Sequence, residues 1–273
     1  PPLDFPEILE VSQIYSVVWK LNKDQPLITQ RPFRQVHHTA SKVSIIGGGT
    51  HLTPGEISLA HKGILFFDEL TEFPREVLEV LRQPLEDSVI NISRVSGTVE
   101  YPANVMFIAS MNPCKCGYYK DPEKSCSCSL SEIKRYQSKI SGPLLDRIDM
   151  ILEIPREKID TLLTKSLNQS STELRQQVIK AWKIQKDRFW KSGIQTNAMM
   201  EAKDIDHYIQ LDSACKDFLS QAAERFTLSG RVIHRLLKLG RTIADMEGKD
   251  QLEVGHLMEA IHYRSKTMFV ENE

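Results

Sequence analysis

The most constraining feature of this chain is a short apolar run that ends in two adjacent carboxylates. Ile64 to Phe67 are all apolar, Gly63 precedes them, and Asp68 and Glu69 follow. A run bounded in this way predicts a strand buried on both faces of a parallel sheet. Such a strand delivers Asp68 and Glu69 to its carboxyl edge, where open α/β sheets bind ligands. One carboxylate can then hold Mg²⁺ while the other activates a water, which indicates nucleotide hydrolysis; a plain strand end meeting solvent is the alternative.

Composition narrows the class of protein without deciding its function. The chain has 273 residues, of which 41% are hydrophobic and 26% charged, as in a soluble globular protein of one large or two smaller domains. The net charge is −1, so a surface for nucleic acid would have to be local. No apolar stretch approaches the length of a membrane span and no signal peptide is visible, so we expect a cytoplasmic protein without a membrane partner.

The first half of the chain mixes helical and strand patterns. Asp4 and Glu7 have capping-box spacing at the start of a predicted helix over 4–22. Two alternating arms around Gly97 predict a hairpin over 89–101. The remaining patterns predict buried strands at 105–109 and 150–154 and helices at 74–85 and 131–140.

Beyond about residue 156 the strand patterns end and helical periodicity takes over. The predicted helices lie near 172–191, 213–226, 229–246 and 253–266. The sequence therefore predicts an α/β core over 1–155, a connection rich in Ser, Thr and Asn over 156–171, and a helical domain over 172–273.

The stretch from 25 to 55 contains no Asp or Glu. Its basic side chains include Arg31, Arg34, His37, His38 and Lys42. A loop of one charge sign attracts an anion such as a phosphate backbone, so these residues are candidate DNA contacts. The alternative is a solvated surface loop whose basic groups pair with acids elsewhere in the chain. The three consecutive glycines at 47–49 indicate a flexible tip or a close approach of the backbone.

The order of these pieces resembles an AAA+ ATPase, and more narrowly the bacterial magnesium-chelatase-like family in the group of the competence proteins ComM and YifB. The resemblance extends over nearly the whole chain. Its motifs are Arg31-Pro32-Phe33-Arg34, His37-His38, Gly47-Gly48-Gly49, Pro54 to His61, Gly63 to Leu70, Arg82 to Glu86, Ile92-Ser93-Arg94, Asn112-Pro113-Cys114, Leu144 to Arg147 and Arg241 to Asp245. The implied fold is an AAA+ P-loop NTPase-type parallel sheet core, truncated in its N-terminal part, followed by an all-α lid domain.

The resemblance assigns roles to the polar residues at the strand ends. Asp68 and Glu69 correspond to the Walker B pair, in which Asp68 supports Mg²⁺ and Glu69 polarises the attacking water. Asn112 corresponds to sensor 1, whose amide can hydrogen-bond the γ-phosphate of ATP and the water together.

The resemblance also implies that arginines contact nucleotide phosphates, and three arginines are candidates. Arg147 resembles an arginine finger that acts on the nucleotide of a neighbouring subunit, since a guanidinium binds phosphate oxygens bidentately and is always charged. An ion pair with Asp146 or Asp149 is the alternative for Arg147. Arg231 resembles sensor 2, and Arg235, one turn further on, competes for that role.

The hairpin over 89–101 takes the place of an insertion that, in related helicases, projects into the pore of a ring and contacts DNA. Arg94 near its turn would be the contacting residue, and a plain surface hairpin is the alternative. The acid-free stretch would be a second pore-facing insertion. The resemblance therefore implies a homo-oligomer, expected to be a hexameric ring, that acts on single-stranded or branched DNA.

One motif of the family does not occur in this sequence. No G-x-x-x-x-G-K-[ST] loop is present to cradle the phosphates of ATP, and the glycines at 47–49 are not followed by Gly-Lys. We therefore expect the chain to be a fragment that follows this loop and to bind nucleotide weakly by itself, while the parent protein is the ATPase.

Four of the five cysteines lie in one short window. Cys114, Cys116, Cys126 and Cys128 form two C-x-C pairs, and four thiolates match the count for a closed structural zinc site. Free thiols, a redox pair or an empty site are the alternatives. Cys215 lies alone in a predicted helix and is expected to be a small core residue.

Three functions remain open from the sequence. The resemblance favours an ATP-driven DNA helicase or branch-migration translocase of recombination and natural transformation, with ATP, Mg²⁺ and Zn²⁺ as cofactors. The second possibility is a chelatase-type ATPase that remodels a partner protein. The third is a zinc-stabilised interaction module without catalysis.

Overall fold

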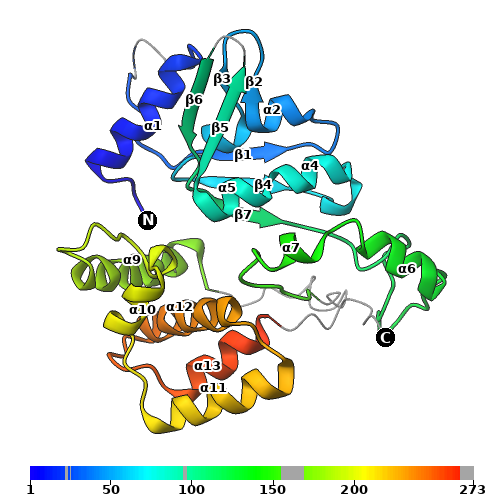
Figure 1. Cartoon of the computed structure of the whole chain (residues 1–273), viewed down its shortest axis with the longest axis vertical. Coiled ribbons are helices and arrows are strands. Elements are labelled where there is room, and N and C mark those ends of the chain that lie inside the picture. The colour runs from blue at the N-terminus through cyan, green and yellow to red at the C-terminus, as the bar shows by residue number, and fades with distance from the viewer. Residues whose placement is uncertain (22–23, 25, 95–96, 155–168, 265–273) are drawn as a thin grey trace. The chain divides into compact units, whose positions relative to one another are not determined.

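The computed structural model describes residues 1–21, 24, 26–94, 97–154 and 169–264 (Figure 1). The chain divides into two compact units, one running from Pro2 to Arg147 and the other beginning at Ile148. The first is built around a parallel sheet and the second is mostly helical, as the predicted fold class requires. Within the described ranges, no helix has the length and apolar character needed to cross a bilayer.

A three-stranded parallel sheet forms the centre of the first unit. Its strands are β1 (Phe33–Val36), β4 (Ile64–Phe67) and β7 (Met106–Ala109), in the order β1-β4-β7 (Figure 1). The strand predicted at 64–67 is confirmed as the central strand. Gly63 is needed at its start, because a Cβ there would lie 2.0 Å from the carbonyl oxygen of Pro32 at the start of β1.

Only one face of this sheet is buried. Leu65 and Phe67 of β4 have no exposed surface, whereas Phe33 of β1 and Met106 of β7 are 59% and 62% exposed on the opposite face. The prediction of burial on both faces is therefore met on one face only. The strand predicted at 105–109 is confirmed as β7, but its predicted burial is wrong, because β7 lies at the edge of the described sheet with β4 as its one hydrogen-bonded neighbour there.

The stretch predicted to be a basic loop is largely structured. Besides β1 it contains three short elements, α2 (Lys42–Ile46), β2 (Gly47–Gly48) and β3 (Thr53–Pro54), and α3 (Glu56–Leu59) follows directly. Gly47 has a φ of 102°, and a Cβ there would lie 2.4 Å from the carbonyl oxygen of Thr53. The close backbone approach predicted for the glycine run is thus confirmed, and it brings β2 against β3.

Helix α1 (Phe5–Val17) opens with the predicted capping box between Asp4 and Glu7. It ends before the predicted residue 22, since Trp19 has a left-handed backbone with a φ of 54°. The helix predicted at 74–85 is two short helices, α4 (Arg75–Val80) and α5 (Arg82–Asp87), which follow a 3₁₀ turn η1 (Leu70–Glu72).

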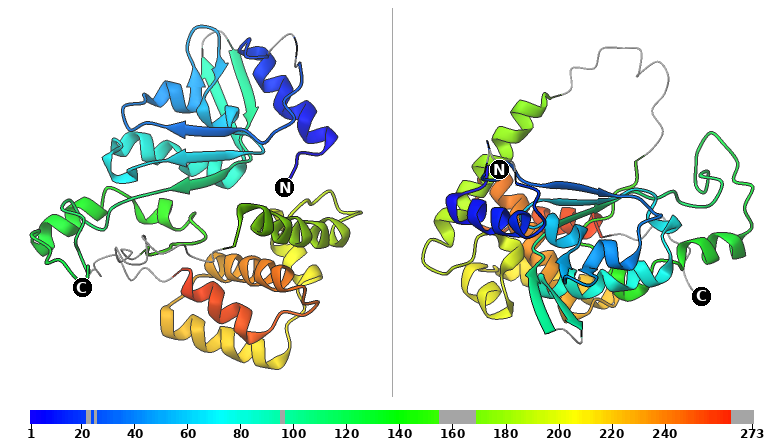
Figure 2. Two further views of the ribbon diagram at one scale, coloured as in Figure 1. Left: turned by 180° about the vertical axis from the view of Figure 1, so that it is seen from behind. Right: turned by 90° about the horizontal axis from the view of Figure 1, so that it is seen from above.

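The predicted hairpin is confirmed. Strands β5 (Val89–Arg94) and β6 (Gly97–Pro102) pair antiparallel, and the turn at 95–96 lies outside the described residues. Ile90 and Ile92 anchor its base in the core of the first unit. Figures 1 and 2 show the hairpin projecting away from the three-stranded sheet.

The first unit ends with two helices. Helix α6 (Leu130–Gln137) confirms the helical pattern near 131–140, and α7 (Gly142–Leu145) precedes Arg147. The predicted strand at 150–154 is wrong. Its residues form no strand in the described chain, and the backbone N–H of Ile151 donates to the carbonyl of Tyr263.

The second unit is a bundle of helices around Phe189, Cys215 and Leu257. Its elements are α9 (Ser171–Arg188), η2 (Asn197–Met199), α10 (Ala202–Tyr208), α11 (Ser213–Phe226), α12 (Gly230–Glu247) and α13 (Val254–His262). The four predicted helices are confirmed, while η2 and α10 were not predicted. Most of the predicted connection, residues 156–168, and the last predicted helical residues, 265–266, lie outside the described residues.

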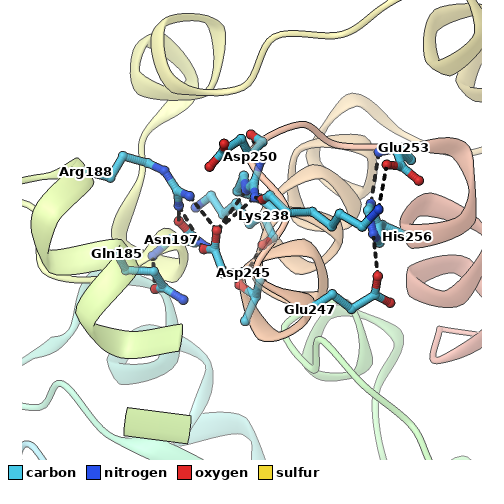
Figure 3. Close-up of polar contacts among 12 residues, drawn as sticks. Gln185, Arg188, Asn197, Lys238, Asp245, Glu247, Asp250, Glu253 and His256 are labelled. Carbon is cyan, nitrogen blue, oxygen red and sulfur yellow. Dashed lines mark hydrogen bonds and ion pairs between the residues drawn. The ribbon is translucent and has the colours of Figure 1, made fainter. Parts of the chain in front are cut away.

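A buried charge network joins α9, η2 and α12 (Figure 3). Asp245 is 1% exposed and accepts hydrogen bonds from Arg188 at 2.8 Å, Arg241 at 3.1 Å and Asn197 at 2.7 Å. The backbone N–H of Asn197 donates to the side-chain oxygen of Gln185 at 2.9 Å. Because every partner of the buried carboxylate is a donor, the network fixes α12 against α9.

Candidate functional site

The three parallel strands bring their carboxyl ends to one edge of the sheet. His37 and His38 follow β1, Asp68 and Glu69 follow β4, and Ser110 follows β7. A pocket of about 400 Å³ lies at this edge, lined by Gln35, Val36, His37, His38, Asp68 and Glu69. The predicted delivery of both carboxylates to the ligand-binding edge of a parallel sheet is therefore observed.

Asp68 is held by donors on one of its two oxygens. Its Oδ1 accepts hydrogen bonds from the hydroxyl of Ser110 and from the backbone N–H of Glu69, the latter at 3.1 Å. No described residue hydrogen-bonds Oδ2. A carboxylate anchored through one oxygen presents the other to a cation such as Mg²⁺.

Glu69 has a backbone conformation that is unusual for a residue with a side chain. Its φ of 54° and ψ of 52° are left-handed, and its side chain is 56% exposed. Such strain is tolerated where the surroundings fix it, and it is concentrated at functional sites. The turn directs the Glu69 carboxylate to the pocket, where its Oε2 lies 3.9 Å from Nδ1 of His38.

The two histidines belong to this pocket rather than to a separate basic loop. Their rings lie 4.2 Å apart, and the His38 ring meets the ring of Phe73 edge-on. The Nδ1 of His37 is hydrogen-bonded to the hydroxyl of Thr39 at 2.9 Å. The sequence singled out both histidines but gave no sign that they would face Glu69.

The other basic residues of the stretch do not share one surface role. Arg31 forms an ion pair with Glu7 at 2.9 Å, and Arg34 binds both carboxylate oxygens of Glu56 at 2.6 and 2.8 Å. For these two arginines the ion pairs agree with the alternative of pairing with acids elsewhere in the chain, and their contact with DNA stays a prediction. Lys42 is exposed in the first turn of α2.

Arg94 closes β5 opposite Gly97, next to the turn of the projecting hairpin. Asn112 is exposed, three residues beyond the end of β7, at the start of the cysteine loop. Arg94 therefore lies beside the hairpin turn as predicted, whereas Asn112 lies beyond the tip of its strand, and the roles of both residues stay predictions.

Arg147 is engaged within its own chain. Its guanidinium forms an ion pair with Glu86 of α5 and donates to the carbonyl of Pro143 at 2.7 Å, and its side chain is 11% exposed. Glu86 is thus a partner that the sequence did not suggest. Of the two sensor 2 candidates on α12, Arg231 is exposed and Arg235 pairs with Asp149 at 2.7 Å.

The four cysteines of the predicted knuckle converge. The Sγ atoms of Cys114, Cys116, Cys126 and Cys128 all lie within 4.8 Å of one another. The separations among the first three are 3.4, 3.5 and 3.7 Å. A tetrahedral zinc ion with Zn–S bonds of about 2.3 Å would need separations of about 3.8 Å, so this donor set fits zinc.

Charge within the cluster also fits a divalent cation. A backbone hydrogen bond from Tyr118 leads the interactions that lower the pKa of Cys116 to about 5. For Cys126, the backbone hydrogen bond from Cys128 lowers the pKa, but burial and the neighbouring sulfurs outweigh it and raise the pKa to about 12. One thiolate thus suppresses the ionisation of its neighbours, and a bound cation would relieve this repulsion.

Helix α6 links the cysteine loop to the segment that follows Glu69. The helix starts two residues after Cys128, and Gln137 at its end donates to the carbonyl of Pro113 at 2.8 Å. Tyr136 is hydrogen-bonded to the hydroxyl of Thr71, and Lys139 donates to the Thr71 carbonyl at 2.7 Å. The loop and the carboxylate turn are therefore parts of one connected structure.

Two family models match the sequence. "Magnesium chelatase, subunit ChlI" covers residues 1–162, and "Magnesium chelatase, subunit ChlI C-terminal" covers residues 168–264.

Individual relatives agree with these matches. The competence protein ComM of Haemophilus influenzae is 41% identical over 243 residues, which are 89% of this chain and 47% of the relative. The uncharacterized protein YifB of Salmonella typhimurium is 41% identical over 268 residues, which are 97% of this chain and 51% of the relative. The maternal DNA replication licensing factor mcm6 of Xenopus tropicalis is 20% identical over 222 residues, 78% of this chain and 26% of the relative. The chain spans about half the length of the first two of these relatives.

Proposed function

Because the chain belongs to the magnesium chelatase subunit ChlI family of AAA+ ATPases, we propose that the natural protein hydrolyses ATP at the carboxyl edge of the β1-β4-β7 sheet. The observation that supports this most strongly is the Asp68–Glu69 pair. It stands at the end of the central strand, with one carboxylate anchored and the other directed to a pocket.

Each residue of the edge has a distinct proposed task. Asp68 offers Oδ2 to Mg²⁺, which when bound neutralises charge on the β- and γ-phosphates. Glu69 accepts a hydrogen bond from the attacking water and orients it toward the γ-phosphate. Asn112 donates its amide to the γ-phosphate, which fits its place beyond the neighbouring strand.

Three arginines are proposed to contact phosphates from outside the sheet edge. Arg231 and Arg235, on the first turns of α12, are the candidates for a contact within the chain, and Arg147 for a contact with the nucleotide of a neighbouring subunit. Arg147 would have to leave Glu86 to do so. A guanidinium can make this exchange, because its geometry suits both carboxylate and phosphate.

We further propose that the ATPase moves on DNA as a ring of identical subunits. The projecting hairpin carries Arg94 beside its turn, where a cation could contact a phosphate backbone. The names of two relatives, a competence protein and a DNA replication licensing factor, agree with DNA as the partner. Remodelling of a partner protein is the second candidate, and DNA binding that weakens steeply with salt would favour the first.

Zinc is proposed as a structural cofactor. Cys114, Cys116, Cys126 and Cys128 would fill all four positions of the ion, so the site would hold the loop together and would not activate water. The third candidate function, a zinc-stabilised module without catalysis, requires that the sheet edge with Asp68 and Glu69 has no ATPase activity.

The substitution Glu69→Gln in the natural full-length protein tests the ATPase proposal. We expect ATP binding to be retained and steady-state hydrolysis to fall at least about 100-fold, since the amide cannot accept the proton of the water. Glu72→Gln is the matched control, because Glu72 is an exposed glutamate of the same segment. Unchanged turnover in Glu69→Gln would remove Glu69 from its role, and absence of turnover in the wild type would favour the module without catalysis.

A further inference from the structure

Ser110, the first residue after β7, contacts the Asp68–Glu69 turn through both its backbone and its side chain. Its N–H donates to the carbonyl of Phe67 and its carbonyl accepts from the N–H of Leu70, each at 2.9 Å. Its hydroxyl donates to Oδ1 of Asp68 and accepts from the N–H of Glu69 at 3.3 Å. These bonds span the turn from the residue before Asp68 to the residue after Glu69.

The two kinds of contact have different requirements. Any residue except proline at position 110 can supply the backbone bonds, which continue the ladder between β4 and β7. The side-chain bonds need a group that donates to a carboxylate and accepts from an amide at the same time, and the serine hydroxyl does both on one short side chain. The side chain of Ser110 therefore adds something that the sheet alone does not provide.

The hydroxyl acts on both catalytic candidates. By occupying Oδ1 of Asp68, it fixes the rotation of the carboxylate and leaves Oδ2 facing outward. By accepting from the N–H of Glu69, it stabilises a left-handed residue at which only glycine is free of steric cost. The hydrogen bond to Asp68 is charge-assisted and thus among the stronger kinds.

We propose that Ser110 is a positioning residue that holds Asp68 toward the metal and keeps Glu69 in the turn from which it orients water. This inference rests on the proposed ATPase function. Ser110 is exposed, so removing its hydroxyl leaves neither a cavity nor a buried unpaired group, and the fold should survive the change.

The test compares Ser110→Ala and Ser110→Thr in the natural full-length protein. For Ser110→Ala we expect kcat to fall about tenfold with the KM for ATP within about twofold, the size expected for one lost hydrogen bond to a charged group at an exposed site. Ser110→Thr keeps the hydroxyl and should restore kcat to within about threefold of wild type. Ser16→Ala, which removes an exposed serine hydroxyl bonded to Gln13 in α1, is the control and should change neither parameter.

A second measurement does not depend on hydrolysis. Hydrogen exchange over 68–70, read by mass spectrometry, should be about tenfold faster in Ser110→Ala than in wild type or Ser16→Ala, because the Glu69 amide loses an acceptor. Wild-type exchange and wild-type kcat in Ser110→Ala would overturn the proposal. Faster exchange in Ser110→Ala, combined with a wild-type protein that shows no ATPase activity, would overturn the ATPase proposal and support the positioning of the turn by Ser110.

Discussion

Replacing Asp245 by Asn tests how much of the helical unit depends on one buried charge. The Asp245 side chain has no exposed surface, and its two oxygens face donors from Arg188, Arg241 and Asn197. Asn has nearly the same shape, but it carries no charge and turns an NH₂ group toward the donors around it, of which the two guanidinium groups cannot accept a hydrogen bond. The substitution therefore leaves two guanidinium groups close together without their common counter-ion.

The cost can be worked from the burial of the partners. The Arg241 side chain is 4% exposed and the Arg188 side chain 17%, so water can replace the lost carboxylate only in part. Removal of one partner from a buried ion pair costs about 3–5 kcal/mol. For a unit of about 100 residues, 4 kcal/mol corresponds to a fall in Tm of about 15–20 °C.

Thermal unfolding followed by circular dichroism at 222 nm measures this effect, since the affected unit holds the long helices. Asp206→Asn is the matched control, because Asp206 is an exposed aspartate of α10 in the same unit, and it should shift Tm by no more than about 2 °C. A destabilisation below about 1 kcal/mol for Asp245→Asn would show that the two arginines find other partners. The same network orients α12, which carries both sensor 2 candidates.

Two further predictions concern the first unit. Elemental analysis should find one zinc ion per chain, and removal of the zinc by a chelator should lower Tm. The variant Cys126→Ser should contain no zinc, whereas Cys215→Ser, which changes a cysteine of the other unit, should keep the ion. Equal zinc content in the two variants would refute the site. Burial lowers the pKa of His61, with the hydrogen bond to Glu10 opposing it only partly. Stability from neutral His61 is therefore complete above about pH 6.5 and falls as the pH drops toward the folded-state pKa, by at most about 1.4 kcal/mol per pH unit. Between pH 7.5 and 5.5, Tm should fall less in His61→Gln than in wild type, and parallel profiles would contradict this.

The features that the sequence predicted are those whose signal is local. The capping box of Asp4 and Glu7, the hairpin around Gly97 and the helix at 213–226 are each specified within a short window. The strand at 64–67 also carries its own signal in its apolar run. These elements form because neighbouring residues favour the same backbone conformation.

The features that were missed depend on partners distant in sequence. β1 has the exposed Phe33 and Gln35 on one face and becomes a strand because β4 lies beside it. Residues 150–154 are as apolar as a strand, yet no described strand pairs with them.

Side-chain partners show the same limit. Arg34 forms an ion pair with Glu56, which is 22 residues away in the sequence. Arg188 forms an ion pair with Asp245, which is 57 residues away. The closeness of Ser110 to Asp68 could have been inferred only from the parallel pairing of β4 and β7. The available signal in the sequence was that Ser110, a polar residue, directly follows the apolar run at 105–109.

The left-handed backbone of Glu69 affects what happens when variants of this protein are selected for thermal stability. Glycine would adopt the same φ without the steric cost of about 1–2 kcal/mol that a side chain incurs there. A search that rewards thermal stability alone would therefore favour glycine at position 69 and discard the carboxylate. With the role proposed for Glu69, stability and activity are opposed at this residue, so a library screened for heat resistance needs an activity screen beside it.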